Sequence, residues 1–524
     1  MYNFNTLKST SSLTLYFIYI RTALFRHSET LSRLFLGGML LKCVWVVPKG
    51  QLEPVVLPCD LVQQDDDVQS DAAVITHLKP SPPLPTLQGK SLLTSELNDQ
   101  QIVTRRQLIA GTVQLSIGIS LKRSAPTCNR CGNQDKEQFA MFDCYWCGRN
   151  ECLYCRSCIM MGKVTTCTPL VHIPVAEPFP KTRLSWHGLL TDAQKRASKQ
   201  MVEILQHRTD NELLVWAVCG AGKTEMLFPL IIEAIDQKKT LLIATPRTDV
   251  VLELIPRIRQ AFPNLRSIAL YGGSEERFQS APLVISTTHQ TRRYFQYFDV
   301  VIIDEIDAFP YHYDNSLRFA VTKAAKPSAK FYYLSATPPQ FLIKKLKTNN
   351  QIAMINRRYH GYPLPVPSLK WIGDWRSYVE RGKLPPKLTA LMNRQERESD
   401  RQLLIFVPSI NVSERLESII ARKDIICVHS KHAKRKEIVD AFRHKQYHCL
   451  ITTTILERGV TFPSVDVFIL GAENDVFTIA ALVQIAGRAG RSQEDPKGNV
   501  LFLHDGTTIA MKQAVKQIKR MNEG

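Results

Sequence analysis

From about residue 186 to the end of the chain, short apolar runs rich in β-branched residues alternate with segments of helical length. Nearly continuous apolar runs are typical of strands covered on both faces, and strands joined by helices predict parallel sheets. The ten expected strands are Leu213–Val218, Leu241–Thr245, Leu283–Ser286, Val300–Ile303, Phe331–Leu334, Leu403–Val407, Ile425–Val428, Leu450–Thr453, Val465–Leu470 and Val500–Leu503. Ten strands are too many for one small sheet, and Pro, Gly and Tyr accumulate at 350–398. The pattern therefore predicts two α/β lobes of similar size.

Ahead of the lobes the pattern is less regular. Residues 61–89 combine an acidic run with a proline cluster, which is typical of a linker. No stretch reaches the roughly 20 uninterrupted apolar residues of a membrane-spanning helix, and Leu31–Val47 is broken by Arg33 and Lys42. The expected organisation is an N-terminal extension and linker, poorly structured, at 1–88, a short helical element at 89–123, a cysteine-rich zinc module at 124–170, a first lobe at 180–355, a linker at 356–397 and a second lobe at 398–524.

The composition fits a folded soluble protein, because 44% of the 524 residues are apolar and 22% are charged. Lys and Arg number 67 against 48 Asp and Glu, which gives a formal net charge of +19. Such an excess favours a polyanionic partner, since neutralising phosphates releases condensed counterions. Nucleic acid is the partner that this charge balance favours.

The sequence AVCGAGKTE at Ala217–Glu225 follows an expected strand and opens an expected helix. Small residues at this place let backbone N–H groups close around phosphates, so the sequence predicts an ATP-binding phosphate loop. Ala217 replaces the first glycine of the common pattern, and Pro229 is expected to kink the helix that follows. The expected ligands of the nucleotide are Gly220, Ala221, Gly222, Lys223, Thr224 and Glu225, with Lys223 at the β/γ-phosphates and Thr224 on Mg²⁺.

Two further blocks carry candidate catalytic groups. VVIIDEID at Val300–Asp307 is a buried strand that ends in carboxylates, where Asp304 is expected to hold Mg²⁺ and Glu305 to orient or deprotonate the attacking water. QIAGRAGRS runs from Gln484 to Ser492 in the second lobe. Its arginines lie on one helical face and could stabilise charge on the transferring phosphoryl group across a cleft between the lobes. The catalytic residues expected in this block are Gln484, Arg488 and Arg491.

Together these blocks resemble the superfamily-2 helicase pattern, whose fold is two RecA-like lobes in tandem. The resemblance implies that Gln194 reads adenine, that Ser335–Thr337 links nucleotide state to lobe movement, and that Glu457 and Gly459 approach the nucleotide. The residues that it assigns to nucleic-acid contact are Arg247, Thr288, His289, Thr453 and Arg458.

The cysteine module holds Cys-x2-Cys pairs at 128/131, 144/147 and 155/158, plus Cys152 and Cys167. Two such pairs close a tetrahedral Zn²⁺ site, and their crowding favours metal over disulfides. Spacing leaves the ligands open: Cys128 and Cys131 pair either with Cys144 and Cys147 or with Cys155 and Cys158. The eight thiols could also hold two ions.

The whole set of blocks resembles the ComFA family of late-competence ATPases from transformable Gram-positive bacteria, over roughly residues 88–524. The matching motifs include CNRCG, YCRSCIMMGKV, WHGLLTDAQ, AVCGAGKTEMLFP, DEIDAFPY, LSATPP, TTTILERGVTFP and QIAGRAGRS. The resemblance implies zinc at Cys128, Cys131, Cys155 and Cys158. It also implies a cytosolic ATPase, peripheral at the inner face of the membrane, that draws single-stranded DNA through the uptake channel. The implied partner is the phosphoribosyltransferase-like ComFC protein. A homo-oligomer of the chain is a separate expectation.

Three other functions share part of this pattern. A replication-restart helicase combines zinc with a similar motor, but its cysteines lie inside the second lobe, whereas these precede the first. An RNA helicase would differ in the nucleic acid that stimulates it. A zinc-dependent DNA-binding scaffold with an inactive motor is disfavoured by intact Lys223, Asp304, Glu305 and Arg488.

Overall fold

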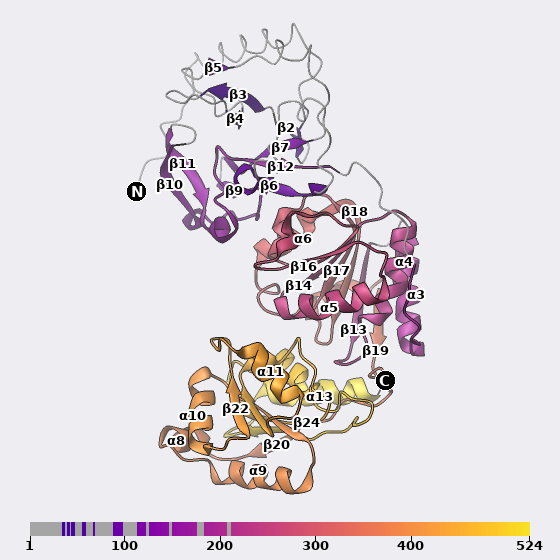
Figure 1. Cartoon of the computed structure of the whole chain (residues 1–524), viewed down its shortest axis with the longest axis vertical. Coiled ribbons are helices and arrows are strands. Elements are labelled where there is room, and N and C mark those ends of the chain that lie inside the picture. The colour runs from indigo at the N-terminus through magenta and orange to yellow at the C-terminus, as the bar shows by residue number, and fades with distance from the viewer. Residues whose placement is uncertain are drawn as a thin grey trace.

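In the computed structural model, two helix-flanked parallel sheets lie one after the other, and a β-rich N-terminal part packs at the far end of the first (Figure 1). The two RecA-like lobes expected from the sequence are confirmed. No helix in the described part of the chain is long and apolar enough to cross a bilayer. The structure describes residues 34–36, 39–41, 43–47, 55–58, 67–68, 87–97, 113–121, 125–145, 149–174, 183–206, 211–349 and 351–523.

The first lobe contains a seven-stranded parallel sheet in the order β15-β16-β14-β17-β18-β13-β19. Every residue of β14 and β16 is buried, as expected for apolar strands covered on both faces. The strands are β13 (Glu212–Ala217), β14 (Leu241–Thr245), β15 (Ser267–Leu270), β16 (Leu283–Thr287), β17 (Phe298–Asp304), β18 (Ala325–Ser335) and β19 (Ile352–Ile355). The helices are α3 (Asp192–Gln206), α4 (Phe228–Asp236), α5 (Thr248–Ala261), α6 (Asn315–Ala324) and α7 (Gln340–Lys347), with 3-10 turns η10 (Glu225–Leu227), η11 (Glu275–Phe278) and η12 (Gln290–Arg293).

The second lobe contains a six-stranded parallel sheet in the order β20-β25-β24-β21-β23-β22. Its strands are β20 (Ser368–Trp371), β21 (Gln402–Phe406), β22 (Ile425–Val428), β23 (Cys449–Thr452), β24 (Val465–Leu470) and β25 (Val500–His504). Its helices are α8 (Trp375–Glu380), α9 (Pro386–Glu398), α10 (Ile410–Ile420), α11 (Arg435–Arg443), α12 (Ile479–Ala486) and α13 (Ile509–Glu523), with the turn η13 (Thr454–Leu456). The structure differs from the expected linker at 356–397, because β20, α8 and most of α9 lie there and belong to this lobe.

The N-terminal part is built of strands where a helical element was expected. Strands β6 (Ser91–Leu93), β12 (Pro169–His172) and β7 (Gln114–Ile117) form an antiparallel sheet, and β8 (Ile119–Leu121) pairs with β9 (Pro126–Cys128). Val113, Leu115, Ile117 and Ile119 are all buried. Their spacing of two is that of a strand, which is why 113–121 is not helical. Short strands also occur in the extension expected to be poorly structured: β1 (Leu34–Leu36), β2 (Met39–Leu41), β3 (Cys43–Val47), β4 (Val55–Pro58) and β5 (Asp67–Val68).

The cysteine-bearing module consists of β9, the hairpin of β10 (Phe139–Cys144) and β11 (Arg149–Cys155), and the turns η6 (Thr94–Glu96), η8 (Lys136–Gln138) and η9 (Arg156–Met161). Buried ion pairs attach it to the first lobe. The carboxylate of Glu96 lies 2.6 Å from Arg130 of the module and 2.9 Å from Arg293 of the lobe. Lys323 donates to the carbonyl oxygens of Arg130 and Arg292. Module and first lobe therefore present a common surface of fixed shape.

Candidate active site

The phosphate loop leaves β13 at Ala217 and enters η10 at Glu225. Gly220 and Gly222 have φ of +80° and +69°, a region that favours glycine. A Cβ at Gly222 would lie 2.4 Å from Nε2 of Gln194. That amide nitrogen donates to the carbonyl oxygens of Ala221 at 2.8 Å and Gly222 at 3.1 Å. The side chain of Gln194 thus holds the backbone of the phosphate loop. The expected contact of Gln194 with adenine stays a prediction.

The helix behind the loop starts later than the sequence pattern suggested. The 3-10 turn η10 precedes α4, and Pro229 lies in the first turn of α4. Proline is tolerated at this place, because the first N–H groups of a helix have no partner within it. The expected kink is therefore replaced by a late helix start.

Lys223 lies beside the acidic end of β17, with its Nζ 3.3 Å from Oδ1 of Asp304. Burial alone would lower the pKa of Lys223, but the nearby charges of Asp304 and Glu305 outweigh it, so the pKa lies above its usual value. The ammonium group is therefore charged at neutral pH. A half-buried cation next to a carboxylate at a glycine loop suits the phosphates and the Mg²⁺ of a nucleotide.

Glu305 is held in an unusual backbone conformation. Its φ is +55°, although it is not a glycine, and its side chain is largely buried. Such a conformation costs about 1–3 kcal/mol and persists where the surroundings impose it, often at functional sites. Its Oε2 receives no hydrogen bond from the residues described here, and the nearest cation is Arg458 at 3.6 Å. This buried carboxylate oxygen therefore faces the guanidinium of Arg458, while Glu305 as a whole keeps 9% of its surface exposed.

The second lobe brings Gln484, Arg488 and Arg491 to the same place. A cavity of about 540 Å³ between the lobes is lined by these three residues and by 219–225, Asp304, Glu305 and Gly459. Its volume is in the range of small-molecule sites. Cys219 of the phosphate loop donates from Sγ to Oε1 of Gln484 at 3.0 Å. The lobes approach closely here, since a Cβ on Gly487 would lie 2.5 Å from that of Cys219.

Both arginines line the cavity, but their guanidinium groups are held by the backbone of 457–461. Arg488 is 2% exposed and donates to the carbonyl oxygens of Glu457, at 2.6 Å, and Val460. Arg491 donates to Oγ1 of Thr461 at 3.2 Å. Burial, followed by the charge of Arg491, lowers the pKa of Arg488. Their contact with the γ-phosphate stays a prediction.

Arg458 pairs with the acidic block across the lobes rather than lying on an open face. Its guanidinium lies 2.5 Å from Oδ2 of Asp307. The same oxygen accepts from Thr337 Oγ1 at 2.6 Å, and Oδ1 of Asp307 accepts from Ser335 Oγ at 2.6 Å. Burial would raise the pKa of Asp307, but Arg458 outweighs it and the pKa is lowered, so the carboxylate is ionised. The sequence pattern predicted no role for Asp307, because its neighbours in the chain do not indicate that Arg458, 151 residues away, is its partner.

Other residues of the cavity were not picked out from the sequence. Trp186 lines it from the quoted WHGLLTDAQ segment, and Arg257 donates to Oε1 of Glu225 at 2.8 Å. Tyr359 of the expected linker also lines the cavity, and Arg358 precedes it in the chain. The backbone N–H of Tyr359 donates to Gly220 at 3.0 Å, and Arg358 donates to the carbonyl oxygen of Gly490. Of these residues, only Trp186 could have been predicted from the sequence to line the cavity, because it is aromatic.

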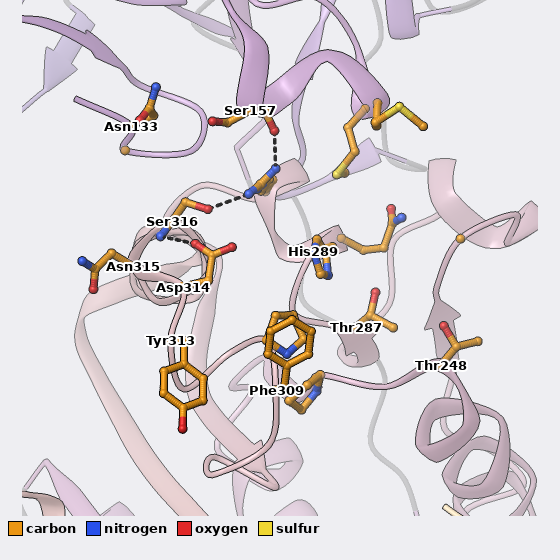
Figure 2. Close-up of a pocket in the computed structure, with 18 of the residues that line it drawn as sticks. Asn133, Ser157, Thr248, Thr287, His289, Phe309, Tyr313, Asp314, Asn315 and Ser316 are labelled. Carbon is orange, nitrogen blue, oxygen red and sulfur yellow. Dashed lines mark hydrogen bonds between the residues drawn. The ribbon is translucent and has the colours of Figure 1, made fainter. Parts of the chain in front are cut away.

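A second, larger hollow of about 1210 Å³ opens between the module and the first lobe. We call it the groove. Figure 2 shows Phe309, Tyr313 and His289 on the lobe side and Asn133 and Ser157 on the module side. Phe309 and Tyr313 are 76% and 72% exposed. Arg292 joins the two walls, donating to the carbonyl oxygen of Ser157 at 3.0 Å and to Oγ of Ser316 at 2.7 Å (Figure 2).

Of the residues expected to contact nucleic acid, His289 alone lines the groove. Thr288, beside it, is fully buried. Arg247 donates instead to the carbonyl oxygen of Ile455 in the second lobe at 2.6 Å. Thr453 precedes η13 and is half-buried. The structure therefore does not gather these five residues into one patch.

Four buried cysteines of the module form a compact cluster of Cys128, Cys131, Cys155 and Cys158. The Sγ atoms of Cys128 and Cys158 are 3.8 Å apart, and those of Cys131 and Cys155 are 3.7 Å apart. Zn–S bonds of about 2.3 Å in a tetrahedron separate the sulfurs by roughly 3.8 Å, so the donor set fits zinc. The alternative set with Cys144 and Cys147 is not the one brought together: Cys144 lies with Cys152 and Cys167, and Cys147 lies outside the described residues. Two cysteine clusters could thus bind zinc.

Comparison with known proteins agrees with this geometry. The model of the competence protein ComFA N-terminal domain matches residues 81–172, that of the type III restriction enzyme res subunit matches 188–340, and that of the helicase conserved C-terminal domain matches 385–493. The chain is an enzyme of the ATPase and helicase class. In fold it is similar to Mycobacterium smegmatis helicase Lhr bound to ssDNA and AMP-PNP, at a TM-score of 0.47 and 18% identity, over 64% of this chain and 48% of that one.

Two curated proteins are similar over most of their length. Competence protein ComFA of Bacillus subtilis (strain 168) is 44% identical over 446 residues, which cover 84% of this chain and 94% of that protein. Competence protein ComFA of Streptococcus pneumoniae (strain ATCC BAA-255 / R6) is 38% identical over 403 residues, covering 76% and 90%. The resemblance stated from the motifs is confirmed, and the chain belongs to the ComFA family of competence proteins.

Proposed function

We propose that this competence ATPase moves along single-stranded DNA and that the movement serves DNA uptake. The observation that carries the proposal is the loop after β17, which serves two sites. Asp304, the last residue of β17, and Glu305, the first residue of the loop, line the nucleotide cavity. Phe309 and Tyr313, a few residues later, line the groove. A strand bound in the groove would press on the same loop that holds the catalytic carboxylates. Nucleotide state and grip on the strand are thereby coupled over a short distance.

ATP with Mg²⁺, when bound, supplies the phosphoryl group that is transferred to water. In the proposal, N–H groups of the phosphate loop and Lys223 hold the phosphates, while Thr224 and Asp304 hold the metal. Glu305, which lines the same cavity, orients the attacking water. Arg488 and Arg491 stabilise the developing charge once the lobes close, and Gln194 and Trp186 lie where the base would bind.

The groove suits a single strand for three reasons. Exposed Phe309 and Tyr313 offer faces on which bases of any sequence can stack. Helix α5 begins at Thr248 on the groove without a side-chain cap, so its first N–H groups can bind a phosphate. The net charge of +19 attracts the polyanion. We further propose that zinc at Cys128, Cys131, Cys155 and Cys158 keeps the module wall folded.

Family membership supports the remaining proposals about partners and place. We propose that the chain works in the cytoplasm at the inner face of the membrane, next to the DNA-uptake channel, and together with a ComFC-type phosphoribosyltransferase-like protein. Self-association into a homo-oligomer belongs to the same proposal. Co-purification of the tagged chain with ComFC, and its fractionation with and without membranes, test these points directly.

The deciding experiment is ATP turnover of the purified chain without nucleic acid, with single-stranded DNA and with RNA of the same length and sequence. We expect DNA to stimulate turnover several-fold, and more than RNA does. Lys223→Ala should abolish turnover and leave DNA binding intact, because Lys223 lies in the nucleotide cavity and not in the groove. Equal rates with and without DNA would contradict movement on DNA. Stronger stimulation by RNA would favour an RNA helicase, and absence of turnover a scaffold.

A further inference from the structure

We propose that the module holds a second zinc ion, bound by the thiolates of Cys144, Cys152 and Cys167. These three cysteines are all buried, and their sulfur atoms lie within 4.8 Å of one another. Sγ of Cys167 is 3.6 Å from that of Cys144 and 3.5 Å from that of Cys152. A disulfide needs about 2.05 Å, whereas ligands of one tetrahedral zinc lie roughly 3.8 Å apart. The cluster therefore has the spacing of metal ligands and not of a disulfide.

The second cluster is separate from the first because of the geometry of β11. Side chains alternate between the two faces of a strand, so residues an odd number apart point to opposite faces. Cys152 and Cys155 both belong to β11 and are three residues apart. Cys155 enters the first cluster and Cys152 the second, with no cysteine shared between the two. One ion cannot serve both faces of the strand, so two clusters mean two ions.

The segment 164–166 pairs with β11, and this pairing positions the third ligand, Cys167. The N–H of Cys155 donates to the carbonyl oxygen of Val164, and the N–H of Thr166 donates to that of Leu153, each at 3.0 Å. This pairing lays 164–166 alongside the strand and brings Cys167 beside Cys152. The far end of the hairpin supplies Cys144, which lies opposite Arg149 after a register shift in β10.

The surroundings of the thiols suit thiolates. Oγ1 of Thr166 lies 3.1 Å from Sγ of Cys152, and Oγ1 of Thr165 lies 3.3 Å from Sγ of Cys167. Hydroxyl groups that donate to ligand atoms orient them and stabilise their negative charge. Zinc takes thiolates in a tetrahedral arrangement, so the three cysteines fill three of its four positions and a further donor takes the fourth. A cluster of several irons would hold its cysteines farther apart than one ion does.

The position of the second site gives it a role in the groove, a part of the inference that rests on the proposed function. Turn η9 carries Ser157, Met160 and Met161, which line the module wall of the groove. Cys155 and Cys158 fix the start of this turn to the first cluster, and Cys167 fixes the segment after it to the second. With an ion on either side, η9 stays in place while single-stranded DNA moves through the groove.

Metal analysis of the full-length chain, purified after zinc saturation and removal of loose metal, tests the proposal. We expect two zinc ions per chain in the wild type and one in the C144A/C152A/C167A variant. The matched control is Cys427→Ala, which removes a buried thiol from β22 in the second lobe and should keep two ions. One zinc per chain in the wild type would overturn the proposal, whether or not the triple variant folds.

A second measurement separates this inference from the proposed function. The ratio of DNA-stimulated to basal ATP turnover should fall several-fold in the triple variant and remain unchanged in Cys427→Ala. A wild type that binds two zinc ions but is not stimulated by DNA would refute movement on DNA and leave the second site standing. A wild type that is stimulated by DNA but binds one zinc would refute the second site alone.

Discussion

Arg458 of the second lobe and Asp307 of the first form an ion pair at 2.5 Å, although 151 residues separate them in the chain. Arg458 is 2% exposed, and Asp307 also holds Ser335 and Thr337. A single carboxylate thus joins the acidic block, the serine–threonine block and the second lobe. Because the guanidinium also lies 3.6 Å from Glu305, any lobe movement that displaces Arg458 changes the charge around the expected catalytic carboxylate.

Arg458→Ala should lower DNA-stimulated ATP turnover at least tenfold, because it leaves Asp307 buried without its cation and uncouples the lobes. A tenfold loss corresponds to about 1.4 kcal/mol of barrier. The matched control is Arg435→Ala, which breaks the Asp249–Arg435 contact of 2.6 Å between the same lobes but away from the acidic block. We expect the control to change turnover about twofold or less. Equal losses in the two variants would show that Arg458 only holds the lobes together.

Phe309→Ala and Tyr313→Ala should each weaken single-strand binding by about tenfold, since stacking on an aromatic side chain is worth about 1–3 kcal/mol per base. Neither change removes a charge, so the dependence of affinity on salt should stay the same. Trp371→Ala is the control, because Trp371 is 58% exposed on the edge strand β20 of the second lobe. Fluorescence anisotropy with a labelled oligothymidine measures all three. An affinity within twofold of wild type for both groove variants would place the strand elsewhere.

Glu96→Gln should destabilise the junction between module and first lobe by about 3–5 kcal/mol, because it leaves Arg130 and Arg293 buried without a counter-charge. The exposed pair Glu398–Arg394 provides a control, since Glu398→Gln should cost about 0.5 kcal/mol or less. The first transition in urea unfolding of the zinc-loaded chain reports the difference. Identical curves for the two variants would mean that packing, rather than charge, attaches the module.

The central strands were predictable from sequence, whereas three edge strands were not. Strands β15, β19 and β20 lie at the edges of their sheets, and each has one neighbour. Strand β20 has a single neighbour and no buried residue, so it needs no continuous apolar run. This is why β20 fell within an expected linker.

The residues of the site were also predictable only where a local sequence pattern identifies them, and not where their role depends on a contact distant in the chain. Lys223 and Asp304 were found because each follows a strand in a recognisable pattern. Arg458 was assigned to nucleic acid, because its own segment does not reveal Asp307 as a neighbour. Likewise, cysteine spacing left two zinc sets open. The folded hairpin decides between these two ligand sets. Its register places Cys155, at the end of β11, opposite Phe139, and the Sγ atom of Cys155 lies 3.7 Å from that of Cys131.

Acidification should weaken the junction between the β6-β12-β7 sheet and the first lobe through His172, the last residue of β12. Its ring packs against that of Phe295 with 4.3 Å between the ring centroids and a tilt of 31°. Its Nε2 lies 2.6 Å from Oγ of Ser116, and its Nδ1 has no hydrogen-bond partner among the residues described. Burial, followed by the charge of Lys323, lowers the pKa of His172 from 6.5 to about 3. Between these two values the unfolded chain takes up a proton that the folded chain does not, so stability falls as pH falls.

One such group costs about 1.4 kcal/mol per pH unit, which amounts to about 2 kcal/mol between pH 7 and pH 5. His172→Gln removes the titrating ring and should flatten this part of the pH profile in urea unfolding with zinc in excess. His444→Gln, at an exposed position on the second lobe, should leave the profile unchanged. Because thiolates of the metal sites also gain protons in acid, only the difference between wild type and His172→Gln reports the histidine. Superimposable profiles for these two proteins would mean that folding does not lower the pKa of His172.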